Sequence, residues 1–269
     1  MAAAAASSAS AAATRTVRLF LFDEGPRAIP PGIELAGPWG EPLLRAIQRA
    51  AWHPWRDATF WRRAAARVAA VPPAELAGRD LAQVCLAFRK IEYASTELVH
   101  CCERFVGERQ RNLNMFELAA VASYCAAASA DARMAQALVG QIADEACIEW
   151  RQREVVPWSA WRMLVTSAAH AQVNHQLLFT TASPHLARSV RFMSGRDAVD
   201  ICGAYASFRF KHNGLLTEMS RFLPSMGLNN REVQALQEAF ERLEFDAPLL
   251  LRIRELHKFG SEGFEQGSS

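Results

Sequence analysis

A fourteen-residue pattern occurs twice in this 269-residue chain, and equivalent residues of the two copies are offset by 117 positions. The first copy, residues 80–93, reads DLAQVCLAFRKIEY, and the second reads DAVDICGAYASFRF. Cys85 falls on Cys202 and Phe88 falls on Tyr205, so small and large apolar residues recur at matching places. Because the pattern contains no catalytic constellation, it indicates a structural unit that the chain uses more than once.

The repeated unit extends into a second helix, since the same offset pairs Leu98 with Leu215 and Phe105 with Phe222. Apolar positions between and beyond the copies recur every 35–43 residues, at Val84, Val121, Leu164, Ile201 and Leu236. This spacing predicts five helix pairs after a basic helical section at about 42–70. The expected first helices span 80–92, 115–128, 158–170, 197–210 and 231–243. The expected second helices span 96–108, 131–148, 174–190, 213–224 and 246–258.

Helix-start signals support this division. Asn114 precedes Glu117 by three residues, and the pairs Ser194 with Asp197 and Asn229 with Glu232 repeat that capping-box spacing. No run of alternating β-branched residues predicts a strand. We therefore expect an all-α fold, an α-solenoid of antiparallel helix-pair repeats of about 35–43 residues stacked in a right-handed superhelix.

In such a stack, each pair buries one face on the pair before it and one on the pair after it. The residues that recur at the repeat spacing should therefore be buried between helices. They are Val84, Cys85, Phe88, Val121, Leu164, Ile201, Cys202, Tyr205, Leu236 and Phe240.

Composition divides the chain into five segments. Residues 1–22 are expected to be a targeting segment, and residues 23–43, rich in Pro and Gly, to form an extended N-terminal arm. A basic helical cap at 44–72 precedes a helical-repeat domain at 73–258. The polar residues 259–269 form a flexible tail.

The first residues, MAAAAASSASAAATRTVRLFLF, are rich in Ala and Ser, contain Arg15 and Arg18, and have no acid before Asp23. This composition is typical of a mitochondrial or plastid transit peptide, and we expect the mitochondrial matrix rather than a plastid. A disordered Ala-rich tail is the alternative. No run of eighteen uncharged apolar residues occurs, so no transmembrane segment is expected.

The net charge is only +2, but the charges are unevenly distributed. Residues 1–72 carry nine Arg against five acids, whereas residues 73–269 carry 21 basic against 23 acidic residues. The cations are 27 Arg and three Lys, and Arg is the better bidentate ligand for phosphate and carboxylate. Codon bias in a GC-rich genome is the alternative explanation for this preference.

Catalytic and metal-binding motifs are missing from the sequence. It has no Gly-rich phosphate loop, no G-x-S-x-G and no H-E-x-x-H, and its seven His are scattered. The six Cys form no C-x-x-C and lie in apolar helical patterns, which indicates buried thiols rather than zinc ligands. We therefore expect no enzyme activity, no cofactor, no metal and no small-molecule substrate.

The helix pairs written as DLAQVCLAFRKIEY and ELVHCCERF resemble the degenerate repeats of organellar RNA-handling proteins, namely the FAST-kinase-like and RAP-domain proteins and their octotricopeptide relatives. The resemblance covers about 75–258 and implies RNA contact through basic residues on one face of the stack. No RAP domain follows the last repeat, and the units are few. These departures favour a short member of the group that is built into a larger assembly.

The stretch LLRAIQRAAWHPWRDATFWRRAAARVAA, residues 43–70, is the strongest candidate for contact with RNA. Arginines of this kind neutralise phosphates, and Trp can stack on a splayed base. A solvated arginine face, with Trp52, Trp55 and Trp61 buried as an end cap, is the alternative, and burial is the favoured expectation for the three Trp. The candidate RNA-binding residues are Arg45, Arg49, Arg56, Arg62, Arg63 and Arg67.

Two classes of function remain open at this point. One is a structural, RNA-contacting subunit of the mitochondrial ribosome or a related RNA-processing assembly, with ribosomal or other organellar RNA and neighbouring subunits as partners. The other is a protein–protein scaffold in another mitochondrial complex, such as a respiratory enzyme or ATP synthase.

Overall fold

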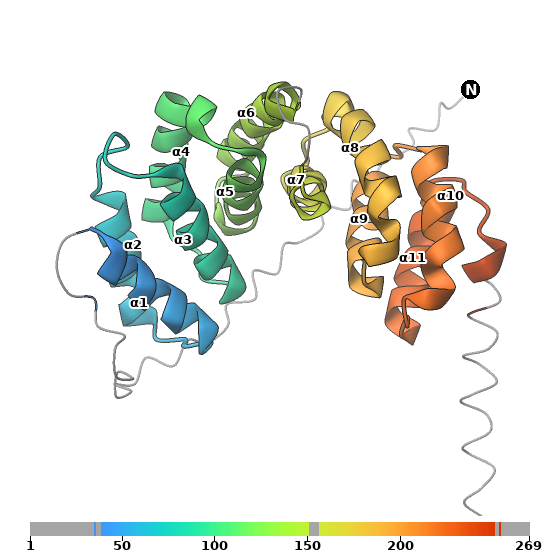
Figure 1. The fold of residues 1–269 in the computed structure, drawn as a ribbon, viewed down its shortest axis with the longest axis horizontal. Helices are drawn as coiled ribbons and strands as arrows, with labels where there is room; N and C mark the ends of the chain where they lie inside the picture. Colours follow the sequence, from blue (N-terminus) through green and yellow to red (C-terminus); the bar gives the residue numbers. More distant parts are fainter. Residues whose placement is uncertain (1–34, 36–38, 151–155, 251–252, 254–269) are drawn as a thin grey trace, which may run out of the picture.

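A computed structural model describes residues 35, 39–150, 156–250 and 253 of the chain (Figure 1). All regular elements within these ranges are helices, and no strand occurs among them. The α-helices are α1 (Glu41–Trp52), α2 (Ala58–Ala69), α3 (Gly78–Lys90), α4 (Thr96–Arg109), α5 (Met115–Ala128), α6 (Ala132–Glu149), α7 (Trp158–His170), α8 (Gln176–Ser189), α9 (Gly195–Ser207), α10 (Asn213–Phe222) and α11 (Asn230–Arg242). Short 3₁₀ turns follow three of them: η1 (Gln110–Asn112), η3 (Val190–Phe192) and η4 (Leu223–Ser225).

The predicted helices agree with the observed ones to within three residues at their ends, for every pair that the structure describes in full. The basic section expected at about 42–70 consists of two helices, α1 and α2. Most of the last expected helix, at 246–258, lies outside the described residues. The same holds for the segments expected at 1–22 and 259–269 and for most of the arm at 23–43.

The helices pack in an alternating order. Helices α1, α3, α5, α7, α9 and α11 follow one another in space, each packed on the next, and α2 packs on α4. Helix α6 contacts α8, and α8 contacts α10. Figure 1 shows these helices side by side in a curved arrangement. Helices α3 to α9 therefore each pack on at least two other helices, which explains the large share of apolar residues in their sequences.

The core prediction is confirmed, because all ten residues named from the repeat spacing are buried. Phe88 of α3 lies edge-on to Trp61 of α2, with ring centroids 4.9 Å apart, and faces Tyr124 of α5 at 6.1 Å. Tyr205 of α9 lies edge-on to Phe179 of α8 at 4.9 Å. The large residue of the repeat therefore fills the space where neighbouring helices meet.

The three predicted capping boxes are present at the first residues of α5, α9 and α11. Two other helices begin with a histidine cap, which the sequence did not indicate. Nδ1 of His175 accepts a hydrogen bond from the Leu178 amide at 3.0 Å, and Nδ1 of His212 accepts one from the Leu215 amide at 3.2 Å. An acceptor at this place satisfies an amide that has no partner within its own helix.

Four helices of the series α1, α3, α5, α7, α9 and α11 end in the same turn geometry. The second residue after α3, α7, α9 and α11 has a positive φ, and the amide after it bonds a carbonyl five residues earlier. The residues with positive φ are Glu92, Gln172, Arg209 and Glu244, at 51–60°. This is the Schellman motif, which satisfies the free carbonyls at a helix end and reverses the chain toward the next helix.

Two glycines occupy equivalent places at the first residues of α3 and α9, where successive units meet. A Cβ on Gly78 would lie 2.5 Å from Cδ2 of Leu113, and a Cβ on Gly195 would lie 2.6 Å from Cδ2 of Leu228. The sequence Gly-Arg-Asp therefore occurs twice because the next unit approaches the backbone closely at this point.

Candidate binding surfaces

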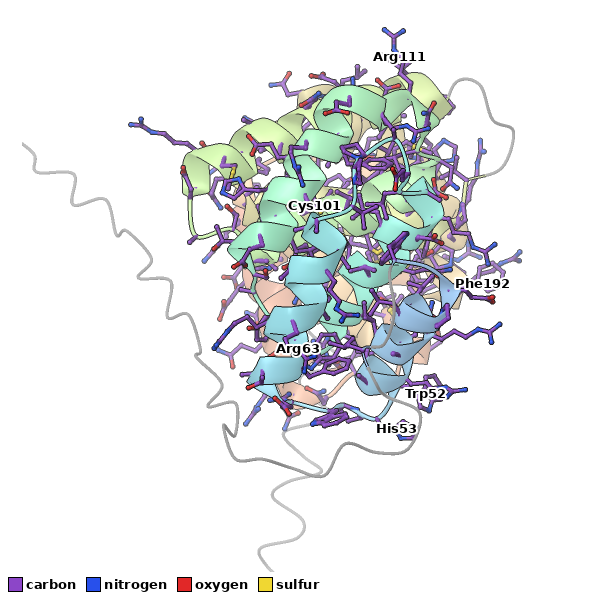
Figure 2. The ribbon with its side chains drawn as sticks, turned by 90° about the vertical axis from the view of Figure 1, so that its left-hand side faces the viewer. Trp52, His53, Arg63, Cys101, Arg111 and Phe192 are labelled. Carbon is purple, nitrogen blue, oxygen red and sulfur yellow. The ribbon has the colours of Figure 1, made fainter. Side chains whose placement is uncertain are left out.

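The six candidate arginines lie on α1, on α2 and in the segment between these helices. Arg45 and Arg49 lie one turn apart on the exposed face of α1, and Arg56 lies in the turn before α2. Arg62 and Arg63 are exposed on α2, whereas Arg67 on the same helix is half-buried. Figure 2 shows Arg63 of α2 at the surface on this end of the molecule.

Several of these arginines already have partners within the chain. Arg45 forms an ion pair with Glu41 one turn earlier on α1. Arg62 opposes the rise in the pKa of Tyr93 that burial causes, and it helps to lower the pKa of the Glu97 carboxyl, after the larger effect of the Ser95 hydroxyl. Such exposed pairs are weak and can exchange for a stronger anion. The six candidate arginines can therefore still contact polyanions, although Arg62 also interacts with residues of the next helix pair.

The expectation that the three tryptophans are buried is wrong for one of them. Trp55 and Trp61 are buried, and the Trp61 indole donates to the Trp55 carbonyl at 2.6 Å. Trp52 is 74% exposed at the end of α1, where Nζ of Lys90 lies 4.8 Å from its ring centroid. The reason is position: Trp52 is the last residue of its helix, beyond the face that packs on α3. Figure 2 shows it at the edge of the molecule beside His53.

A larger feature, which the sequence did not predict, is an open groove over α3, α5, α7 and α9, with a volume of about 1130 Å³. Small side chains give it depth, including Ser123 on α5 and Gly203 on α9. Its charges are mixed, with four cations and three carboxylates in addition to His170. These charged residues are Arg89, Lys90, Arg162, Arg196, Glu92, Asp197 and Asp200.

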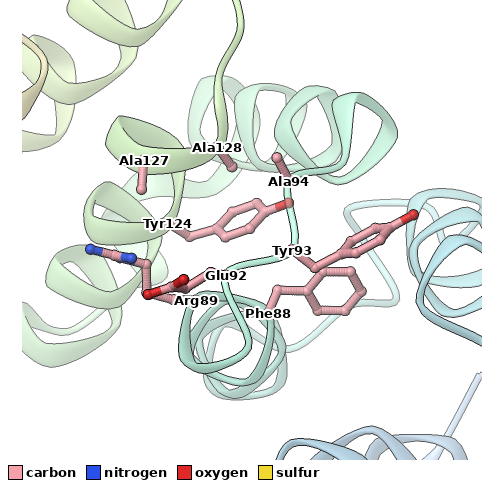
Figure 3. Close-up of a pocket in the computed structure, with 8 residues that line it drawn as sticks. All are labelled: Phe88, Arg89, Glu92, Tyr93, Ala94, Tyr124, Ala127 and Ala128. Carbon is pink, nitrogen blue, oxygen red and sulfur yellow. The ribbon is translucent and has the colours of Figure 1, made fainter. Parts of the chain in front are cut away.

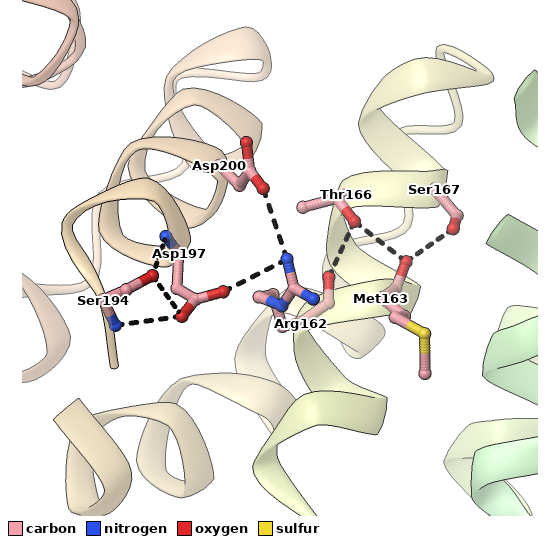
Figure 4. Close-up of polar contacts among 7 residues, drawn as sticks. All are labelled: Arg162, Met163, Thr166, Ser167, Ser194, Asp197 and Asp200. Carbon is pink, nitrogen blue, oxygen red and sulfur yellow. Dashed lines mark hydrogen bonds and ion pairs between the residues drawn. The ribbon is translucent and has the colours of Figure 1, made fainter. Parts of the chain in front are cut away.

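An ion-pair network joins α7 to α9 on the wall of this groove (Figure 4). Nη1 of Arg162 lies 3.2 Å from Oδ1 of Asp197 and 3.3 Å from Oδ2 of Asp200. Burial raises the pKa of the Asp200 carboxyl, and the Arg162 guanidinium opposes that shift. Asp197 also accepts from the Ser194 amide and hydroxyl in the capping box of α9. The network therefore fixes the spacing of two helices and neutralises Arg162.

A second, much smaller hollow of about 70 Å³ lies between the ends of α3 and α5 (Figure 3). Phe88, Tyr93 and Tyr124 form one side of it, and Ala127 and Ala128 form another. Tyr124 accepts a hydrogen bond from the Ser95 amide at 3.1 Å, which commits its hydroxyl to the turn before α4. The hollow is small and offers few polar groups, so it suits one or two water molecules better than a metabolite.

The cysteines are buried thiols, as the sequence predicted. Sγ of Cys85 on α3 lies 3.5 Å from Sγ of Cys102 on α4. Burial raises the pKa of Cys202 to about 12 and the pKa of Cys101 to about 11, so neither is a nucleophile at neutral pH. Within the described ranges, no group of three or more His, Cys, Asp or Glu side chains could hold a metal ion.

No helix in the described part of the chain is both long enough and apolar enough to cross a lipid bilayer. Comparison with models of known protein families finds no match, and comparison with curated proteins finds no significant similarity.

Proposed function

We propose that this chain is a non-catalytic, RNA-contacting helical-repeat subunit of the mitochondrial ribosome or of a related organellar RNA-processing assembly. The observation that carries the proposal is how the side chains are distributed. The recurring apolar residues are taken up between helices, while arginines such as Arg45, Arg49 and Arg63 remain exposed on α1 and α2. Exposed arginines bind phosphate by releasing counterions, so RNA is the partner that this surface suits best.

The proposal includes the finer architecture, an α-solenoid of antiparallel helix pairs with a right-handed superhelix. Three features support it: the alternating packing order of the helices, the recurring turn after α3, α7, α9 and α11, and the equivalent close approaches at Gly78 and Gly195. A stack of this kind offers long surfaces to a partner and needs no active site.

A protein–protein scaffold in another mitochondrial complex is the second candidate, and the groove favours it. Arg162 in the groove is already paired with Asp197 and Asp200, so the groove is not a continuous path for phosphates. Mixed charges beside Leu86, Met163 and other apolar side chains suit an extended protein segment.

Affinity purification of the tagged full-length chain from its own cells, followed by RNA sequencing and protein identification, distinguishes the two candidates. The proposal predicts enrichment of ribosomal or other organellar RNA with proteins of the same particle. Enrichment of respiratory or ATP synthase subunits without RNA would establish the scaffold function instead.

A further inference from the structure

An arginine-rich hollow lies at the other end of the described chain, where α8 and η3 meet α10. Its volume is about 360 Å³, and its lining residues are Ala187, Arg188, Arg191, Glu218 and Phe222. The hollow is separate from the groove over α3, α5, α7 and α9, with which it shares no lining residue.

Two Arg-Phe pairs border this hollow. Phe192 is 64% exposed, and Cζ of Arg191 lies 4.6 Å from its ring centroid. Cζ of Arg221 lies 5.7 Å from the ring centroid of the half-buried Phe222. Burial of a phenylalanine ring is favourable, so packing within this chain does not explain why Phe192 is exposed. Figure 2 shows its ring at the surface of the molecule.

The charge at this surface is strongly positive. Three guanidiniums, from Arg188, Arg191 and Arg221, surround one carboxylate, that of Glu218. Glu218 forms a long ion pair with Arg221, in which Oε1 lies 3.9 Å from Nη1, so its carboxylate offsets one of the three guanidinium charges. The Arg188 charge also helps to lower the pKa of the neighbouring His185, after the larger effect of burial. The surface therefore favours an anionic ligand.

We propose that these residues, defined as the Arg–Phe surface (Arg188, Arg191, Phe192, Arg221 and Phe222), bind a segment of single-stranded RNA. The guanidiniums hold phosphates through paired N–H donors, and Phe192 stacks on a base. An acidic protein segment would use the same arginines but would gain little from an exposed ring beside them. The inference rests on the proposed function and assigns to it a contact site distinct from the arginines of α1 and α2.

Binding of a fluorescent, mixed-sequence single-stranded RNA of twenty nucleotides to the full-length chain tests this assignment. The double variant Arg188→Glu/Arg191→Glu should bind at least tenfold more weakly. It should also lower the salt slope of log K, since each lost phosphate contact removes about 0.7 from that slope. Phe192→Ala should weaken binding roughly tenfold through lost stacking, with little change in the salt slope.

A matched control reverses the same number of charges elsewhere. Arg111→Glu/Arg133→Glu changes two exposed arginines on η1 and α6, far along the chain from the Arg–Phe surface. It should weaken binding much less than the double variant at Arg188 and Arg191. Circular dichroism confirms that every variant keeps its helical content before binding is compared.

The possible outcomes distinguish a failure of the Arg–Phe surface from a failure of the proposed function. If the wild-type chain binds RNA and both variants bind it as tightly as the control variant does, the assignment of the Arg–Phe surface is wrong. The proposed function would still stand. A loss at Arg188 and Arg191 without any loss in Phe192→Ala, together with equal competition by polyglutamate, would assign the surface to an acidic protein. Failure of the wild-type chain to bind RNA, alone or in its purified complex, would overturn both.

Discussion

Phe88 is the side chain at which three consecutive helix pairs meet. Its ring is fully buried and contacts Trp61 of the pair before and Tyr124 of the pair after. Phe88→Ala should therefore lower the free energy of unfolding by about 3–5 kcal/mol, measured by urea denaturation. Phe116→Ala, at a phenylalanine that is 39% exposed, is the control and should cost much less. Equal losses at the two positions would show that Phe88 is not at the centre of the packing.

His185 gives a prediction for the dependence of stability on pH. Its ring is stacked on Trp161 at a centroid distance of 5.3 Å, and burial lowers its pKa. The unfolded chain therefore binds a proton at His185 more readily than the folded chain, so stability falls as the pH drops through the histidine range. The wild-type chain should lose more stability between pH 7.5 and pH 5.5 than His185→Phe, as shown by urea midpoints. A larger loss in the variant would contradict the assigned direction.

At the scale of single residues, the sequence predicted the buried repeat positions well, but it did not predict the exposure of Trp52 or the two histidine caps. The ten repeat positions are buried because the spacing of apolar residues directly reflects which helix face is covered. Trp52 was misassigned because its hydrophobicity does not reveal that α1 ends there. The histidine caps at His175 and His212 were missed because histidine is not a usual capping residue.

At the scale of elements, the contact between successive pairs depends on the space at their first residues. Gly195→Ala would place a methyl group against Leu228 and the Glu232 carboxylate, so it should lower stability by about 1–3 kcal/mol, measured by urea denaturation. Gly107→Ala, on an exposed part of α4 with no atom near the new methyl group, should raise stability by about 0.5–1 kcal/mol. Stabilisation by both changes would show that the close approach at Gly195 is not a constraint.

The element boundaries could be predicted because capping boxes mark where helices begin. The turns that end helices could not, since their positive-φ residues include Glu92, Gln172 and Arg209 instead of the glycine that usually signals this conformation. The turn is maintained by hydrogen bonds and by the partly buried apolar residue that follows, so side-chain identity at the positive-φ position carries little information.

At the scale of the molecule, the groove and the Arg–Phe surface could not be predicted, because each gathers residues from helices that are distant in sequence. Leu86 and Ser207 line one groove although more than a hundred positions separate them. The six candidate arginines of α1 and α2, by contrast, lie within one continuous stretch of sequence, residues 43–70. The structure places these arginines on and between two helices, so they form one interaction surface only if a partner covers both helices.

Charge reversal on α2 tests whether these arginines contact a partner within the assembly. Arg62→Glu/Arg63→Glu should weaken incorporation of the chain into its complex and make incorporation more sensitive to salt, while circular dichroism remains unchanged. Arg63→Glu alone is the control for folding, because Arg62 also interacts electrostatically with Tyr93 of the next pair. Unchanged incorporation of the double variant would identify these arginines as a solvated face.

The central claim, that this chain functions as part of an RNA-containing particle, is tested most directly by sedimentation of the native full-length chain from organelle lysate. The account predicts that the chain sediments with a large particle and shifts to lighter fractions after ribonuclease treatment. Sedimentation as a free monomer, or with a large particle that ribonuclease leaves unchanged, would contradict it.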